Sequence, residues 1–138
     1  MPNLEGLVSV RIITRSDGEE FVTLADGRIS RHGNDYRVLF SEKTANGVIY
    51  SNLLIAEEIA QIRRRGAANC EMVFDRSCKT HGTYSSGGLA TDFDVETSRY
   101  DVAYSDGKIV VNLEYYLLGG GIGRFELEIT ISERDMSH

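Results

Sequence analysis

Residues 108–131 read KIVVNLEYYLLGGGIGRFELEITI, and this stretch decides the fold. Apolar and polar side chains alternate through its second half, with the apolar ones at Phe125, Leu127, Ile129 and Ile131. The first half alternates in the same way, with one apolar face at Ile109, Val111, Leu113, Tyr115 and Leu117. A period of two residues predicts strands with one buried and one solvated face. The glycine-rich residues 119–123 predict a hairpin loop, so we expect paired antiparallel strands over 108–118 and 124–132.

Turn signals separate similar alternating runs along the rest of the chain. Ser-Asp-Gly occurs at 16–18 and at 105–107, as expected of tight hairpins. Further reversals are predicted at Asp26-Gly27, Gly33-Asn34-Asp35 and Asn46-Gly47. The single proline, Pro2, lies outside every predicted strand. Many strands, short turns and no parallel crossover predict an all-β domain built as a meander, sandwich or barrel.

One segment has two interpretations. Residues 53–65, LLIAEEIAQIRRR, are rich in helix-forming residues, and Ile55, Ile59 and Ile62 have helical spacing. The alternative is a hairpin that turns at residues 56–58, with Ser51, Leu53 and Ile55 on one face of the incoming strand. The residues alone leave both open.

Composition bounds the class of protein. The chain has 138 residues, 41% hydrophobic and 26% charged, which is the usual size and make-up of one globular domain. We therefore expect a single domain over 1–138, with its core at about 7–133. A formal charge of -6 argues against nucleic acid, and no apolar run is long enough to cross a membrane. The N-terminus does not read as a secretory signal, so we expect a cytoplasmic protein. Reduced thiols are the simplest interpretation of Cys70 and Cys78, and a bridge between neighbouring strands is the alternative.

Spaced single residues over about 7–133 resemble the YwiB-like bacterial family, a domain of unknown function. The matching landmarks are Asp17-Gly18, Phe40-x-Glu42, Arg64-x-Gly66, Phe74, Tyr84 and the two C-terminal strands. The family pattern has Tyr-x-Glu where this chain has Phe40-x-Glu42, and the residues after Tyr84 depart from it as well. The resemblance implies a closed antiparallel β-barrel of calycin-like, lipocalin-like type. It also favours the hairpin over the helix for residues 53–65.

Arg64 and Glu42 are the first candidate ligand-binding residues. If Ile62 faces inward, a period of two places Arg64 on the inner face as well, and Glu42 likewise shares a face with Phe40. A charge near an apolar interior must be paired or otherwise satisfied. Either Arg64 binds a ligand carboxylate or phosphate, or it forms an ion pair with Glu42 that closes one end of the barrel. A register slip of one residue would instead place Arg63 and Arg65 inside.

Tyrosines are the second set of candidates. Five of them lie on or beside predicted strands: Tyr36, Tyr84, Tyr100, Tyr104 and Tyr115. Each suits core packing or the wall of a pocket, and Tyr36, Tyr84 and Tyr115 are the candidate ligand contacts. No histidine pair has metal-site spacing, and His81 is expected on a strand surface. Asp92, Asp94 and Glu96 read as a solvated strand face. We name no catalytic residue, metal or cofactor.

The sequence is compatible with two functions. The first is binding of a small amphipathic or anionic molecule inside the barrel, without catalysis. The second is an interaction or scaffold protein with a solidly packed barrel, which uses an outer strand face for a homodimer or another partner. The outward Val110, Tyr116 and Leu118 are the observation behind the second. The chain is expected to be a monomer or a homodimer.

Overall fold

The structure is a computed structural model that describes residues 4–118 and 123–134. Within this part of the chain ten strands follow one another and no helix occurs. The strands are β1 (Gly6–Ser16), β2 (Glu19–His32), β3 (Asp35–Thr44), β4 (Gly47–Ile55), β5 (Ile59–Gly66), β6 (Asn69–Asp75), β7 (Thr80–Ser86), β8 (Leu89–Ser105), β9 (Lys108–Leu118) and β10 (Gly123–Glu133). Among the described residues, nothing helical has the length and apolar character needed to cross a membrane.

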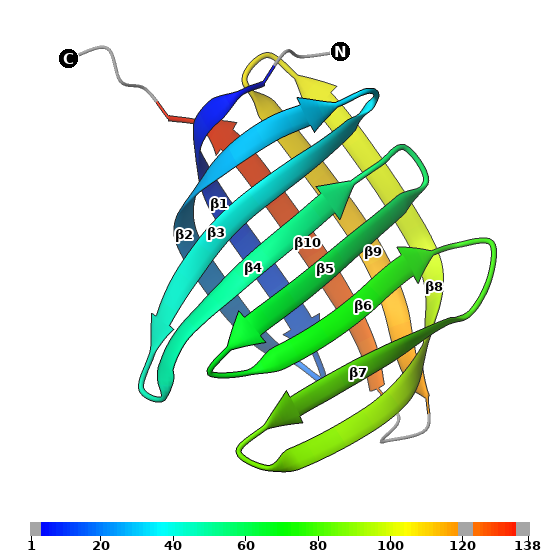
Figure 1. Ribbon diagram of the computed structural model, residues 1–138. Helices are drawn as coiled ribbons and strands as arrows, with labels where there is room; N and C mark the ends of the chain where they lie inside the picture. The colour runs from blue at the N-terminus through cyan, green and yellow to red at the C-terminus, as the bar shows by residue number, and fades with distance from the viewer. Residues whose placement is uncertain (1–3, 119–122, 135–138) are drawn as a thin grey trace.

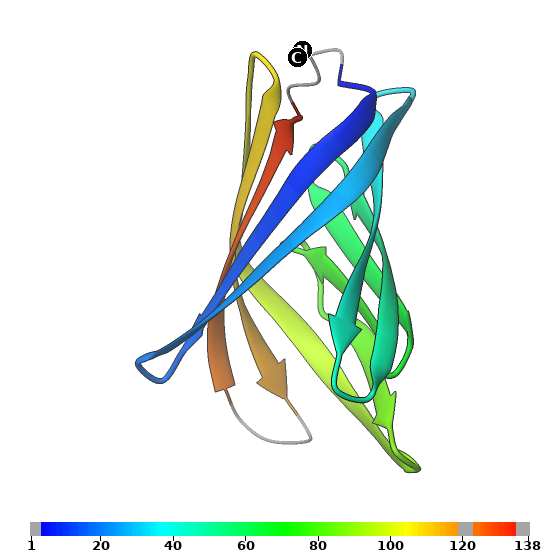
Figure 2. The ribbon, with the colours of Figure 1, turned by 90° about the vertical axis from the view of Figure 1, so that its left-hand side faces the viewer.

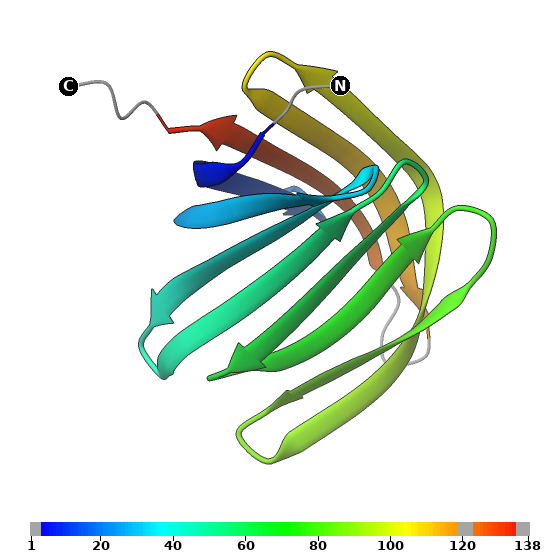
Figure 3. The ribbon, with the colours of Figure 1, turned by 45° about the horizontal axis from the view of Figure 1, so that its top comes forward.

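The strands form one closed barrel (Figures 1 and 3). Each strand pairs antiparallel with the next, and β1 pairs with β10 to close the sheet. This confirms the all-β, closed antiparallel barrel expected from the sequence, and it is consistent with a lipocalin-like fold. The start of β1 and the end of β10 lie together at one end, which we name the termini end; the opposite end is the far end.

Residues 53–65 form a hairpin, as the family resemblance predicted. β4 ends at Ile55 and β5 begins at Ile59, and the Ala56 amide donates to the Ile59 carbonyl at 2.9 Å. The hydroxyl of Tyr100, from β8, donates to the Ala56 carbonyl at 2.6 Å. A long-range contact therefore holds the turn that local helix propensity would have disfavoured.

The predicted turns are mostly confirmed, with one correction. Asp17 and Gly18 have φ of 51° and 77°, the left-handed pair that a two-residue hairpin requires. The reversal predicted at Asp26-Gly27 is wrong, because both residues lie inside β2. A Cβ on Gly27 would lie 2.8 Å from the Leu39 carbonyl oxygen, so this glycine permits close strand packing. The strands beside the predicted glycine loop do pair, while residues 119–122 of that loop lie outside the described residues.

The core is the inward face of all ten strands. Its largest fully buried side chains are Tyr36, Phe74, Ile29, Leu53, Ile55, Ile109, Ile129 and Ile131. The apolar rows predicted on the last two strands lie within it. Because the strands run alternately up and down, residues late in β3, β5, β7 and β9 and early in β6 and β10 share the far half of the barrel.

Candidate functional site

A row of direct cross-strand partners crosses the inner wall of the barrel from β3 to β7. It consists of Phe40, Ser51, Arg64, Cys70 and Tyr84, each aligned with the next in the strand register. Direct partners on neighbouring antiparallel strands point to the same side of the sheet. Phe40 and Ser51 are buried, so this side is the interior. We name these five residues the inner row.

Arg64 faces the interior, whereas its neighbours Arg63 and Arg65 face outward. Both neighbours reach the Glu71 carboxylate, at 3.2 and 3.6 Å. Arg64 forms no ion pair with any residue in the described part of the chain. The charge of its guanidinium lowers the pKa of two inner side chains, Cys70 and Tyr115. Burial raises the pKa of both, so the two effects oppose each other. Among the described residues, the register thus places a half-buried arginine without an ion-pair partner on the inner face of the barrel.

Tyr115 comes from β9, on another part of the wall. Its ring lies 4.9 Å from the Phe74 ring and stacks on Phe125 at 5.2 Å. Burial raises the pKa of Tyr115 to about 12. Its cross-strand partner on β8 is Thr97, a buried residue whose Oγ1 has no hydrogen-bond partner. An aromatic surface with a polar edge therefore lies near the Arg64 guanidinium.

Cys70 is the thiol of the inner row. It is half-buried, and burial raises its pKa, with the neighbouring Glu71 charge acting in the same direction. The guanidinium of Arg64 acts in the opposite direction. Cys70 and Cys78 are both free thiols and are not bonded to each other. Cys70 is a neutral thiol beside a cation.

Glu42 lies one step further toward the far end, on the same face of β3 as Phe40. Its Oε1 atom is buried and has no hydrogen-bond partner, and no ion pair links it to Arg64. The Ser51 hydroxyl is buried and unpartnered in the same way. The Arg64–Glu42 pair that could have closed this end is therefore not formed. Unpartnered polar atoms of this kind carry a desolvation penalty that a bound group can offset.

The structure does not bring all the sequence candidates together. Arg64, Glu42 and Tyr115 lie in the far half of the barrel, and Tyr84 lies at its rim with 45% of its surface exposed. Tyr36 is the second residue of β3 and lies at the termini end, fully buried, with its ring 5.8 Å from that of Tyr104.

Sequence reasoning did not single out Ser51, Cys70 or Thr97. The signal for Ser51 was a small polar residue at an apolar position, two residues before Leu53. Cys70 and Thr97 carried no such signal, because each becomes notable only through its cross-strand partner.

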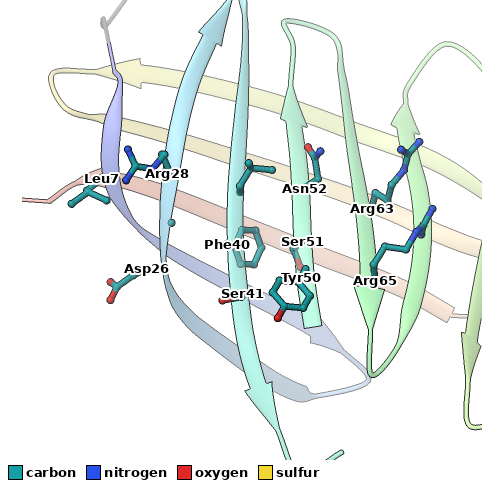
Figure 4. A pocket seen from close by; sticks show the side chains of 12 residues that line it. Leu7, Asp26, Arg28, Phe40, Ser41, Tyr50, Ser51, Asn52, Arg63 and Arg65 are labelled. Atoms are coloured by element: carbon teal, nitrogen blue, oxygen red, sulfur yellow. The ribbon is translucent and has the colours of Figure 1, made fainter. Parts of the chain in front are cut away.

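A groove of about 580 Å³ lies against the outside of the barrel. It begins where the pairing between β2 and β3 ends, and it extends over β4 and β5. Figure 4 shows Tyr50 and Asn52 on β4 beside Arg63 and Arg65 on β5. Two residues of the inner row, Phe40 and Ser51, also line the groove, so the groove lies next to this part of the inner row.

Among the described residues, neither the inner row nor the groove brings together groups suited to catalysis. Within the described residues, the inner row and the groove contain no histidine that could activate Ser51 or Cys70. His81 lies on the outer surface, 3.4 Å from Asp94 and 3.9 Å from Asp92, on the solvated strand face expected for it. Within the described residues, a guanidinium thus lies beside apolar and aromatic side chains, and no hydrogen bond links Ser51 or Cys70 to a basic group.

Comparisons with known proteins give the fold a family. The model of a domain of unknown function, DUF1934, matches residues 7–131. The crystal structure of ywiB protein from Bacillus subtilis is similar over 95% of this chain and 94% of that chain, with a TM-score of 0.76 and 17% identity. At that identity the likeness concerns the fold alone. No curated protein matches the chain.

Proposed function

We propose that the barrel of this chain, which belongs to the DUF1934 family of domains of unknown function, binds a small amphipathic anion through Arg64. One observation carries the proposal: a guanidinium faces the interior without a carboxylate partner among the described residues. Arg64 is half-buried, and an arginine keeps its charge at all physiological pH values, so it cannot avoid the cost of partial burial by losing a proton. A bound carboxylate or phosphate would offset that penalty through paired N–H donors.

The surrounding side chains define the rest of the ligand. Phe74, Tyr115 and Phe125 form a continuous aromatic surface, which suits an apolar body. Ser51 and Thr97 supply hydroxyl groups without partners, and Glu42 supplies an unpartnered acceptor. A hydroxyl or amine on the ligand would satisfy Glu42. We therefore infer an apolar or aromatic molecule with one anionic group and one hydrogen-bond donor.

We further propose that the protein binds this ligand without catalysis, in a reducing, cytoplasmic compartment. Support for the first part is that the hydroxyl of Ser51 has no hydrogen-bond partner in the described residues, so no base is positioned to activate it. Support for the second is that Cys70 and Cys78 are both free thiols. The alternative function, an interaction protein, relied on an outward surface of Val110, Tyr116 and Leu118. Each of these side chains is half-buried.

Fluorescence titration with anilinonaphthalene sulfonate, an amphipathic anion, tests the proposal. The wild type should bind one equivalent, and Arg64→Met should weaken binding by about tenfold, because the anion loses its charged partner. Arg63→Met is the matched control, since it removes the same charge from the outer face one residue away. Circular dichroism and urea unfolding show whether each variant is folded. Equal weakening by both variants would rule out an anchoring role for Arg64.

A further inference from the structure

β2 has a free edge. Its pairing with β3 is limited to residues 27–32, whereas its pairing with β1 continues down to Glu19. Residues 19–26 therefore lack a neighbour on one side within the described chain. Figure 2 shows the β1–β2 hairpin diverging from the β3–β4 hairpin toward the far end. An unpaired strand edge presents backbone N–H and C=O groups that can pair with another strand.

This edge also exposes apolar side chains on both faces of the strand. Phe21, Val22 and Leu24 are 62%, 50% and 73% exposed. Proteins usually protect such an edge with lysine, proline, a bulge or a very short strand. Residues 19–26, EEFVTLAD, contain neither lysine nor proline, and their register with β1 has no bulge. The charged residues Glu19, Glu20 and Asp26 stand at the two ends of the edge, so the uncharged residues 21–25 between them are unprotected, and exposed apolar surface of this kind marks an association site.

Arg28 lies where the free edge ends, and Arg63 and Arg65 lie on β5, with β3 and β4 between them and Arg28 (Figure 4). Arg28, Arg63 and Arg65 line the groove that begins at the end of the free edge, beside the exposed ring of Tyr50 (Figure 4). Arg63 and Arg65 share the single carboxylate of Glu71, and Arg28 has no ion pair within the described residues. The groove thus contains three arginines and one carboxylate, that of Asp26, which pairs with Arg134 at 3.6 Å, on a chain whose formal net charge is -6.

We propose that the free edge of β2 binds an extended, apolar peptide segment of another protein, whose acidic residue reaches the groove at Arg28. The segment would run antiparallel to β2, as every other neighbour in the barrel does. Its acidic residue then lies at its N-terminal end, because β2 runs from Glu19 toward Arg28. Backbone pairing gives affinity in this mode of binding, and side-chain contacts such as the one to Arg28 give selectivity.

Charge disfavours a second copy of this chain as the occupant. Two β2 edges that paired symmetrically over residues 19–26 would place Glu19 opposite Asp26 of the other copy, at both ends of the contact. Like charges directly opposite each other destabilise a strand pair. A partner with apolar residues along the edge and one acidic residue near Arg28 avoids the repulsion at Glu19, and the carboxylate of Asp26 beside Arg28 is already paired with Arg134.

Selection from a phage-displayed library of random dodecapeptides tests this proposal on the full chain. We expect recovered peptides to carry an acidic residue before a run of β-branched or aromatic residues. Leu24→Lys and Arg28→Glu should each weaken their binding by about tenfold. Leu89→Lys is the matched control, because Leu89 is 76% exposed, like Leu24, and lies on another strand. All three positions are exposed, so the fold should be retained.

Three outcomes would overturn the proposal. One is the recovery of no peptide, and another is binding that Leu24→Lys and Leu89→Lys affect equally. The third is a dimer in sedimentation experiments that Leu24→Lys abolishes, which would assign the edge to a second copy. Binding of anilinonaphthalene sulfonate in the Leu24→Lys variant is measured in parallel. Loss of peptide binding with an intact Arg64-dependent site separates this proposal from the proposed function.

Discussion

Ser51 and Arg64 are direct cross-strand partners inside the barrel, yet the Ser51 hydroxyl has no hydrogen-bond partner and Arg64 forms no ion pair among the described residues. Both side chains are polar at positions where the flanking residues of the same face are apolar, such as Leu53 and Ile62. A sequence selected for stability alone would place apolar residues here. The proposed anionic ligand would supply the partner that both side chains lack.

Arg64→Met should stabilise the protein. The change removes a charge that has no described partner and replaces it with an apolar chain of similar length, so the free energy of unfolding should rise by about 1 kcal/mol. Urea unfolding of the ligand-free protein measures it, with Arg63→Met as the comparison. A loss of stability specific to Arg64→Met would mean that the guanidinium has a structural partner.

The two thiols should react at different rates. Cys78 is exposed, whereas Cys70 is half-buried and its pKa is raised by burial, so little of it is thiolate at neutral pH. Labelling of Cys70→Ser and Cys78→Ser variants with a chromogenic disulfide reagent separates the two. Anilinonaphthalene sulfonate should slow labelling of Cys70, the cross-strand partner of Arg64, and leave Cys78 unaffected. Equal protection of both thiols would place the probe elsewhere.

How much could be predicted from sequence differed between the fold and the site. The alternation around Leu127 and Leu113 is local, so the strands and their inward faces were predictable, and so was the inward position of Arg64. Properties that depend on the register between strands could not be predicted. Ser51 became a site residue only because it aligns with Arg64, and the turn of β4 into β5 is held by Tyr100 from a distant strand. Asp26-Gly27 has the composition of a turn, but its glycine serves strand packing instead.

Tyr115 should make stability fall at high pH. Burial raises its pKa to about 12 from an ordinary value of 10.0, so the folded state keeps the proton where the unfolded state loses it. The contribution is fully present below pH 10.0 and is lost as pH rises to about 12. Burial also raises the pKa of Tyr100, which adds a slope of the same sign. Tyr115→Phe should therefore reduce the slope in urea unfolding across this range; an unchanged slope would contradict its assignment to Tyr115.

Gly66→Ala should destabilise the protein far more than Gly87→Ala. Both glycines have positive φ, 117° and 58°, but a Cβ on Gly66 would collide with the Val48 carbonyl, whereas Gly87 faces open space. We expect a loss of about 3 kcal/mol at Gly66 and about 1 kcal/mol at Gly87. Thermal or urea unfolding of the two variants measures both losses. Similar losses would show that backbone conformation alone determines the cost.

Native mass spectrometry of the protein, purified gently from the organism that makes it, tests the central claim most directly. We predict that the wild type carries one small molecule, that Arg63→Met retains it and that Arg64→Met does not. A wild type that carries nothing, or an Arg64→Met variant that carries the same molecule to the same extent, would contradict ligand binding through Arg64.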